Sequence, residues 1–190
     1  KTVVAAEGML QEALRRAKAL AASGTEVFGS PALQRFLRAP HTRDSFKDPA
    51  VLRDFLKLDD HDIMGAVKVW AEHPDTALSR LAKDLLDRRT LRIRLQTKPW
   101  GTDHVAKIRK EVARQMNITE KEAGLFVLTG HLENNAYDNS DGGIQLLYKD
   151  GHLKDIAEAS DNLGIAAMSG MVEKHYLAFP RWLGKEWFED

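Results

Sequence analysis

The chain has no cysteine and no long apolar run, and both absences restrict what it can be. Without cysteine it forms no disulfide and no thiolate metal site, which fits a reducing compartment and predicts a cytoplasmic location. No stretch approaches the roughly 20 apolar residues that span a bilayer, so no membrane association is expected. The 28 basic and 28 acidic residues balance, so no global field attracts nucleic acid. Any anion site must therefore be a local cluster.

Several catalytic motifs are also missing. The sequence has no glycine-rich phosphate loop, no G-x-S-x-G and no H-E-x-x-H. No histidine lies three or four residues from another, so no helix can present a pair of histidine ligands. The seven histidines are His41, His61, His73, His104, His131, His152 and His175. The sequence thus predicts no catalytic residue, no metal ligand and no cofactor within this chain.

The 190 residues have an ordinary globular composition, with 43% hydrophobic and 29% charged residues, which is enough for one or two domains. The chain begins at Lys1 inside an apolar helical stripe, with no initiator methionine and no N-cap. We therefore expect a fragment of a longer protein. The exposed start of the stripe predicts a homo-oligomer, because large apolar patches usually find a partner. The stripe is formed by Val3, Val4, Met9, Leu10, Leu14, Ala17 and Leu20.

Helical periodicity dominates residues 1–89. The first helix should end near Ala22, because Ser23-Gly24 is a C-cap signal. Three further helices should begin at Ser30-Pro31, near Asp48-Pro49 and at Asp59 or Asp60, the last ending near Glu72-His73, with an irregular stretch at 41–50. A final helix opened by Pro74 would carry an apolar stripe and pair Asp84 with Arg88 one turn on. That stripe is Leu78, Leu81, Leu85 and Leu86, and the stripe after Asp60 is Ile63, Met64, Val67 and Trp70.

The apolar period changes from 3.6 to 2 at Thr90, which predicts strands in residues 90–190. The pattern predicts strands at 91–96, 125–128, 144–148, 152–156 and 172–179, with a two-residue hairpin at Asp150-Gly151. A helix capped by Thr102 or Asp103, and a capping box of Thr119 with Glu122, lie between the first two strands. Residues 134–143 should form a polar loop and 157–170 a short helix. The fold class is α+β: a helical bundle segment at 1–89, then a mainly antiparallel sheet at 90–190 with helices on one face.

Two local clusters could carry chemistry. His61-Asp62 spells a metal-binding dyad, but it sits in the first turn of a helix, where Asp59 or Asp60 makes a good cap. A capped helix start explains both residues. The second cluster is four arginines at a helix-to-strand junction, where guanidinium groups suit phosphate but could equally face solvent: Arg88, Arg89, Arg92 and Arg94. Near the end, Trp182 and Trp187 suggest a tail that packs on a surface.

Several stretches together resemble the C-terminal half of bacterial HD-superfamily phosphohydrolases, which are relatives of deoxynucleoside triphosphate triphosphohydrolases. The resemblance runs in order over nearly the whole chain. It is carried by residues 1–7, 58–63 with Trp70, 87–92, 134–137, 148–151, 155–160 and 176–180.

The resemblance implies that the catalytic residues of the parent protein lie outside this chain. The family's metal ligands precede the stretch that matches Lys1, so a divalent metal is expected in the full-length parent and none in this chain. The parent would hydrolyse a (deoxy)nucleotide by metal-activated water, whereas this chain alone would be inactive. It would serve packing and oligomerisation. In a mammalian member, basic residues matching Arg88 and Arg92 contact an activating nucleotide, which implies a regulatory nucleotide effector here; Arg89 is the alternative register.

Two other functions fit the sequence. The chain could be a stand-alone protein-interaction or ligand-sensing module, since small α+β sandwiches often bind through a sheet face. It could also be an HD enzyme in its own right that uses His61 and Asp62. The full-length gene separates these hypotheses, because the first requires an upstream H…HD…D set.

Overall fold

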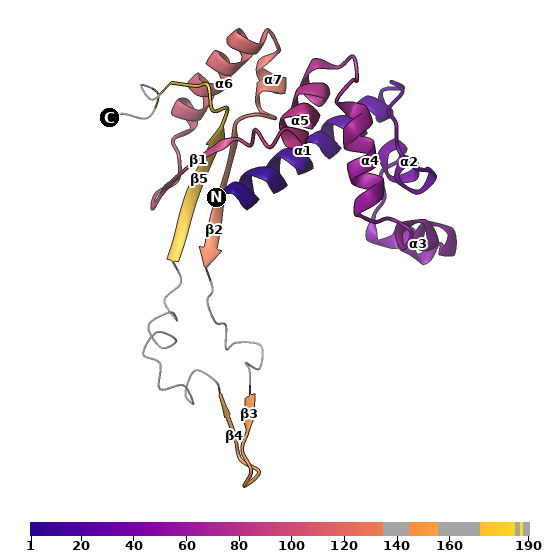
Figure 1. Cartoon of the computed structure of the whole chain (residues 1–190), viewed down its shortest axis with the longest axis vertical. Coiled ribbons are helices and arrows are strands. Elements are labelled where there is room, and N and C mark those ends of the chain that lie inside the picture. The colour runs from indigo at the N-terminus through magenta and orange to yellow at the C-terminus, as the bar shows by residue number, and fades with distance from the viewer. Residues whose placement is uncertain (135–144, 156–171, 185–186, 188–190) are drawn as a thin grey trace. The chain divides into compact units, whose positions relative to one another are not determined.

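The structure is a computed structural model of the chain, and it describes residues 1–134, 145–155, 172–184 and 187. The helix expected at 157–170 lies outside these residues, and so does the loop expected at 134–143 apart from Asn134, which is the last residue of a strand. Figure 1 shows the elements. The helices are α1 (Thr2–Ala22), α2 (Pro31–Arg38), the 3-10 helix η1 (Arg43–Lys47), α3 (Pro49–Phe55), α4 (Asp60–Trp70), α5 (Thr76–Leu86), α6 (Thr102–Met116) and α7 (Glu120–Ala123). The strands are β1 (Arg92–Gln96), β2 (Leu128–Asn134), β3 (Gln145–Leu147), β4 (Leu153–Asp155) and β5 (Val172–Phe179).

These helices and strands confirm the α+β class. Contacts divide the chain into two compact units: residues 1–94, 101–128 and 177–190 form the first, and residues 95–100 and 129–176 the second. The domain boundary expected between residues 89 and 90 stays a prediction. None of the described helices is long and apolar enough to cross a membrane.

Polar side chains cap most of the helices where the sequence predicts them. Ser30 Oγ accepts a hydrogen bond from the Leu33 N–H (3.3 Å), and Asp59 Oδ1 accepts one from the His61 N–H (2.7 Å). Each satisfies backbone donors that the first helical turn leaves free. One prediction is wrong: α6 begins after Gly101, and neither Thr102 nor Asp103 is its cap.

The core of the first unit forms where α1 packs against α2 and α5. The buried seam of α1 differs from the predicted stripe, since its deepest positions are mostly alanines, whereas Val3 is 68% exposed. Alanine lets two helix backbones approach closely, so small residues take the positions in the seam. On α4, Trp70 is fully buried as predicted, but Met64 is 41% exposed. The buried seam of α1 consists of Ala5, Met9, Ala13 and Ala17.

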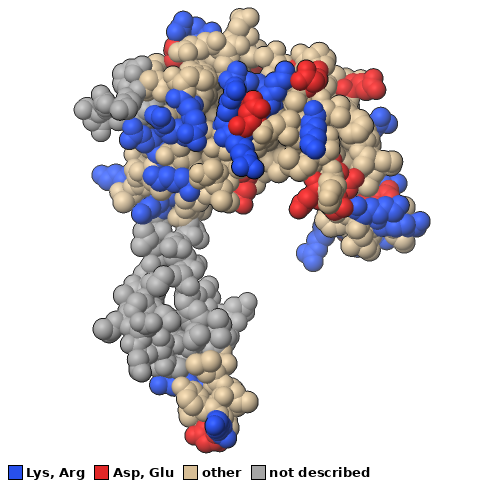
Figure 2. All heavy atoms as spheres, viewed as in Figure 1, with Lys and Arg blue, Asp and Glu red and all other residues tan. Residues whose placement is uncertain are grey.

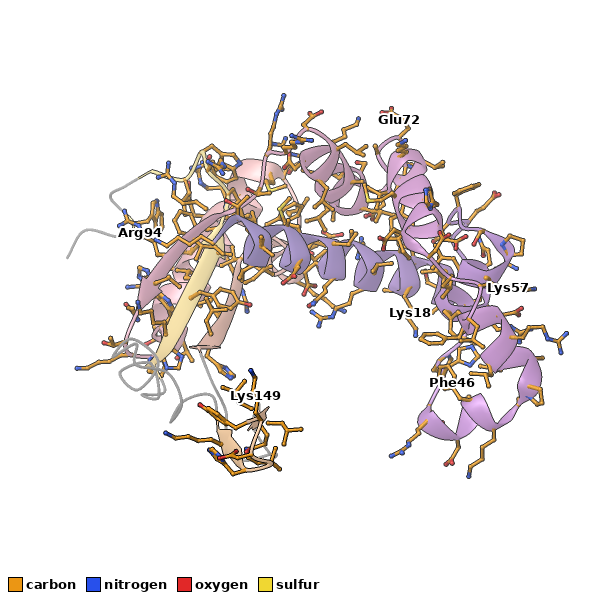
Figure 3. The ribbon with its side chains drawn as sticks, turned by 60° about the horizontal axis from the view of Figure 1, so that its bottom comes forward. Lys18, Phe46, Lys57, Glu72, Arg94 and Lys149 are labelled. Carbon is orange, nitrogen blue, oxygen red and sulfur yellow. The ribbon has the colours of Figure 1, made fainter. Side chains whose placement is uncertain are left out.

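Aromatic rings join α2, η1 and α3 (Figure 3). The Phe46 ring stacks on Phe36 with a centroid distance of 6.4 Å and meets Phe55 edge-on at 5.2 Å. Residues 43–47 form a 3-10 helix, where the polar composition of 41–50 predicts an irregular stretch. A capping box of Thr42 and Ser45 opens this helix.

Three strands form one sheet in the order β1-β5-β2, and in Figure 1 the arrows of β2 and β5 point in opposite directions. Strand β2 begins at Leu128, so the strand predicted at 125–128 is placed too early. Phe126 and Val127 are buried in the turn after α7, which explains their apolar character. On β2, Gly130 lies against the ring of Tyr176 from β5: a Cβ added at Gly130 would come within 2.6 Å of that ring.

Strands β3 and β4 pair antiparallel in a separate two-stranded sheet, with Leu147 opposite Leu153. The connection differs from the two-residue turn that Asp150-Gly151 predicts. The Tyr148 N–H donates to His152 O (2.9 Å), so the loop has three residues, and Gly151 takes the left-handed conformation with φ of 86°. A two-residue type I′ turn would also need positive φ at Asp150, which has none.

Candidate functional site

Helix α5 ends in an unusual way. The Arg89 N–H donates to Asp84 O (2.7 Å) and the Arg88 N–H to Leu85 O (3.1 Å), which is the Schellman pattern of helix termination. Its left-handed position is Arg88, with φ of 57°. Glycine normally fills this position, and it does so at Gly24 after α1. This strained arginine is the first residue of the arginine cluster that the sequence singles out.

This ending overturns one predicted contact. Because Arg88 leaves the helical path, it is not one turn beyond Asp84, and the expected pair is wrong. Asp84 Oδ2 instead accepts a hydrogen bond from Arg80 Nε (2.8 Å), one turn earlier on α5.

The four arginines of the cluster are not equally exposed. Arg88 is exposed, and Arg92 is half-buried as the first residue of β1. Arg89 Nη2 lies 3.5 Å from Asp87 Oδ2, an exposed pair that contributes little to stability. Whether Arg88 and Arg92 bind a nucleotide stays a prediction.

A cavity of about 180 Å³ lies beside the cluster in the first unit. It is lined by Arg89, but by neither Arg88 nor Arg92. An adjoining, more open hollow of about 400 Å³ shares three residues with it: Arg80, Met116 and Trp182. The other residues that line the cavity are Asp84, Leu91, Phe126, Pro180 and Arg181.

Arg181, which follows β5, is held in place by hydrogen bonds to the segment between α5 and β1. Its Nε donates to Thr90 O (2.7 Å) and its Nη2 to Thr90 Oγ1 (3.3 Å). Thr90 is 5% exposed, so both bonds are anchored in the core. Next to it, the Leu91 N–H donates to Met9 Sδ (3.3 Å), which ties this segment to α1. Residues that are distant in sequence, such as Arg80 and Arg181, therefore line the same cavity, and the hydrogen bonds to Thr90 fix the position of Arg181.

The cavity lining is rich in arginine. It contains three guanidinium groups and one carboxylate, that of Asp84, which is paired with Arg80. Figure 2 shows basic side chains close together over the part that holds α5 and α6, with few acidic ones between them. The sequence points to Arg89 but misses Arg80, Arg181 and the role of Trp182, because they lie far apart along the chain. The doublet Arg181-Trp182 just after a strand is the one local signal that could have indicated them.

His61 and Asp62 form no comparable site. Asp59 caps α4 as predicted, and Asp62 Oδ2 accepts from the Asp59 N–H (3.0 Å), which completes a capping box. A hydrogen bond from the Ser30 side chain lowers the pKa of Asp62, and the bond from the Asp59 N–H lowers it further. The His61 side chain is 97% exposed. In the described part of the chain, no three His, Asp or Glu side chains gather closely enough to hold a metal.

One ionic network ties three helices together. Arg16 on α1 donates to Asp75 through Nε (3.0 Å) and Nη2 (2.6 Å), and to Glu122 through Nη2 (2.6 Å). Asp75 also caps α5, since its Oδ1 accepts from the Leu78 N–H (2.8 Å). Glu122 accepts from the backbone and hydroxyl of Thr119 as part of the predicted capping box of α7.

The network lowers the pKa of both carboxyl groups. Desolvation by itself would raise the pKa of Asp75, but the hydrogen bonds from Arg16 and the Leu78 N–H outweigh it and lower that pKa. The Thr119 backbone and hydroxyl, assisted by the charge of Arg16, lower the pKa of Glu122. The hydrogen bond to Asp75 raises the pKa of Arg16, so all three groups are charged near neutral pH.

The described residues form an α+β fold with an arginine-lined cavity in the first unit, and comparison with known proteins adds to this. No protein-family model matches the chain, and no curated protein matches it. Among solved structures, the chain is similar to a phosphohydrolase from Bacteroides thetaiotaomicron, with 43% sequence identity and a TM-score of 0.85.

The similarity covers 95% of this chain and 45% of that phosphohydrolase, so the chain spans less than half of the solved protein's length. The chain therefore has a phosphohydrolase-like fold.

Proposed function

We propose that the chain is the non-catalytic C-terminal part of an HD-type, metal-dependent phosphohydrolase that acts on (deoxy)nucleotides. The supporting observation is the similarity to a phosphohydrolase that covers 95% of this chain at 43% identity but only 45% of the other protein. The HD type and the nucleotide substrate come from the ordered sequence resemblance. In such an enzyme a divalent metal activates the attacking water. This chain supplies packing and oligomer contacts.

The test begins with the full-length gene, which should encode an H…HD…D set before the segment matching Lys1. The full-length protein should release triphosphate from deoxynucleoside triphosphates in manganese. Replacing the Asp of the upstream His-Asp pair with Ala should abolish this activity, whereas His61→Ala should leave it unchanged, since His61 is exposed in a cap.

Two outcomes would contradict the proposal. Loss of activity in His61→Ala would make this chain the catalytic part. A reading frame that starts near Lys1 would favour a stand-alone interaction or ligand-sensing module.

The proposal includes a regulatory nucleotide site at Arg88 and Arg92, completed by a second subunit. The exposure of Arg88 supports it, as does the strained backbone that fixes its direction. Calorimetry with GTP on the full-length protein, with the metal ligands replaced, should show binding that weakens as salt rises. Equal binding by wild type and Arg88→Gly/Arg92→Gln would show that these arginines are an ordinary solvated edge.

A further inference from the structure

We propose that His131 on β2 and His175 on β5 form a metal-binding pair that holds a zinc ion, or a similar divalent transition metal, across the two strands. The inference goes beyond the proposed function, because it uses neither the upstream metal centre nor the arginines after α5. It rests on three features of the described residues: the place of both histidines on one face of the sheet, the distance between their rings, and their access to solvent.

Both histidines lie on the same face of the sheet. Strands β5 and β2 are hydrogen-bonded neighbours and run side by side in Figure 1. On one face, Gly130 lies directly against the ring of Tyr176. Successive side chains of a strand point to opposite faces, so the residue after Gly130, His131, and the residue before Tyr176, which is His175, share the other face. The search for histidine pairs at helical spacing does not detect a pair formed in this way.

The two rings are close enough to bind one ion together. Their centroids are 6.4 Å apart, and their planes are tilted by 55°. A tetrahedral zinc ion with a nitrogen of each ring at about 2.0–2.1 Å would bring the centroids to about 5 Å. Rotation of the two side chains, with the strand pairing unchanged, can supply the remaining approach of about 1 Å. The close contact of Gly130 with Tyr176 keeps the two strands in this alignment.

An ion can reach both rings from solvent, because His131 is exposed and His175 is half-buried. Each imidazole has two nitrogens, so one nitrogen can ligate while the other makes a hydrogen bond that orients the ring. Among the side chains that the structure describes, no third His, Asp or Glu joins the pair. We therefore assign the remaining coordination positions to water.

The imidazole nitrogens select the class of metal. Neutral imidazole suits zinc, copper and nickel, whereas magnesium and calcium prefer oxygen ligands. His131 and His175 lie far apart along the chain, so the ion would close a long loop. A metal that closes a long loop is expected to stabilise a fold more than one that closes a short loop.

Ordinary ring packing is the main competing explanation for the pair. Tyr148 and His152 show such packing, since their rings stack with a centroid distance of 4.4 Å and planes only 8° apart. The rings of His131 and His175 lie near the outer limit of roughly 7 Å for interacting rings, so they gain little from each other. Two protonated imidazoles on neighbouring strands also repel. A shared ion binds both rings in the neutral form, and we therefore favour the metal.

The experiment titrates Zn²⁺ into the purified, chelator-treated chain and measures binding by calorimetry. One Zn²⁺ should bind per chain and should raise the melting temperature, because an ion that binds only the folded pair stabilises the fold. Mg²⁺ should do neither. In NMR spectra, Zn²⁺ should shift the ring signals of two of the seven histidines.

Three variants assign the binding. His131→Gln and His175→Gln should each lower Zn²⁺ affinity at least about tenfold, since the loss of even an outer-shell partner costs about 10–100-fold. Their melting temperatures without zinc show whether each variant is folded, and neither should rise with zinc. The matched control is His61→Gln, because the His61 ring is 97% exposed and lies 3.5 Å from a carboxylate oxygen of Asp59. This variant should bind zinc like wild type.

Three results would overturn the inference. The first is no Zn²⁺ binding by the folded wild-type chain. The second is wild-type affinity in folded His131→Gln and His175→Gln. The third is an equal loss of affinity in His61→Gln, which would mean that zinc binds surface histidines without selection. None of these results bears on whether the full-length protein hydrolyses nucleotides, because that reaction would use the upstream ligands.

Discussion

Replacing Arg16 with Gln should destabilise the fold far more than the same change at an exposed arginine of α1. The guanidinium makes three hydrogen bonds to Asp75 and Glu122. The side chains of Arg16 and Glu122 are each 22% exposed, and that of Asp75 is 14% exposed. Removing it leaves two partly buried carboxylates without their cation. Breaking a fully buried pair costs about 3–5 kcal/mol. Because solvent still reaches this network, we expect a loss of about 2–3 kcal/mol in the free energy of unfolding.

Urea unfolding followed by circular dichroism measures this difference. Arg15→Gln is the matched control: Arg15 is the neighbouring residue, its side chain is 66% exposed, and its ion pair with Glu12 is local. It should change stability by less than about 0.5 kcal/mol. Asp75→Asn keeps an N-cap on α5 and, combined with Arg16→Gln, completes a double-mutant cycle. The two changes should cost less together than the sum of the single changes.

The effect should depend on pH. The folded-state pKa values of Asp75 and Glu122 lie below their ordinary values of 3.8 and 4.5. Their contribution is therefore complete above pH 4.5 and is lost as the pH falls through the lowered folded-state values. The gap between wild type and Arg16→Gln should narrow on acidification below that point. A loss equal to that of Arg15→Gln at neutral pH would refute the reasoning.

Three further predictions follow from single features. Arg88→Gly should keep or raise stability by up to about 1 kcal/mol in thermal unfolding, since it removes left-handed strain, and a drop like that of Arg88→Val would contradict this. The chain alone, with manganese, should release no triphosphate from deoxynucleotides; turnover abolished by His61→Ala would refute this. Light scattering should show self-association through apolar surface at Val3 and Leu56, which are 68% and 74% exposed, and a monomer at high concentration would count against it.

The sequence predicts local features of this fold well. The caps at Ser30, Asp59 and Thr119 each depend on one side chain and a backbone N–H within three residues, so short-range chemistry decides them. The last strand, at 172–179, follows from its alternation and from Pro180. The α+β class follows from the change of period at Thr90.

Features set by long-range packing could not be predicted from the sequence pattern. The seam of α1 uses Ala13 and Ala17 instead of larger neighbours, because α5 must approach closely. The left-handed Arg88 carries no signal, since arginine rarely adopts that conformation. The cavity brings Arg80 next to Arg181, about a hundred residues away, and only the folded chain can show such a meeting. The candidate site could therefore be predicted only in part, through Arg89.

The contact between Gly130 and Tyr176 fixes how two strands align. Sliding β2 by two residues would keep its faces but would bring Leu128 or Leu132 under the ring, where even one Cβ would approach to 2.6 Å. Only one alignment of the strands places a residue without a side chain opposite the tyrosine. The close contact between the glycine backbone and the tyrosine ring therefore disfavours every shifted pairing of β2 with β5, in addition to the hydrogen bonds of the sheet.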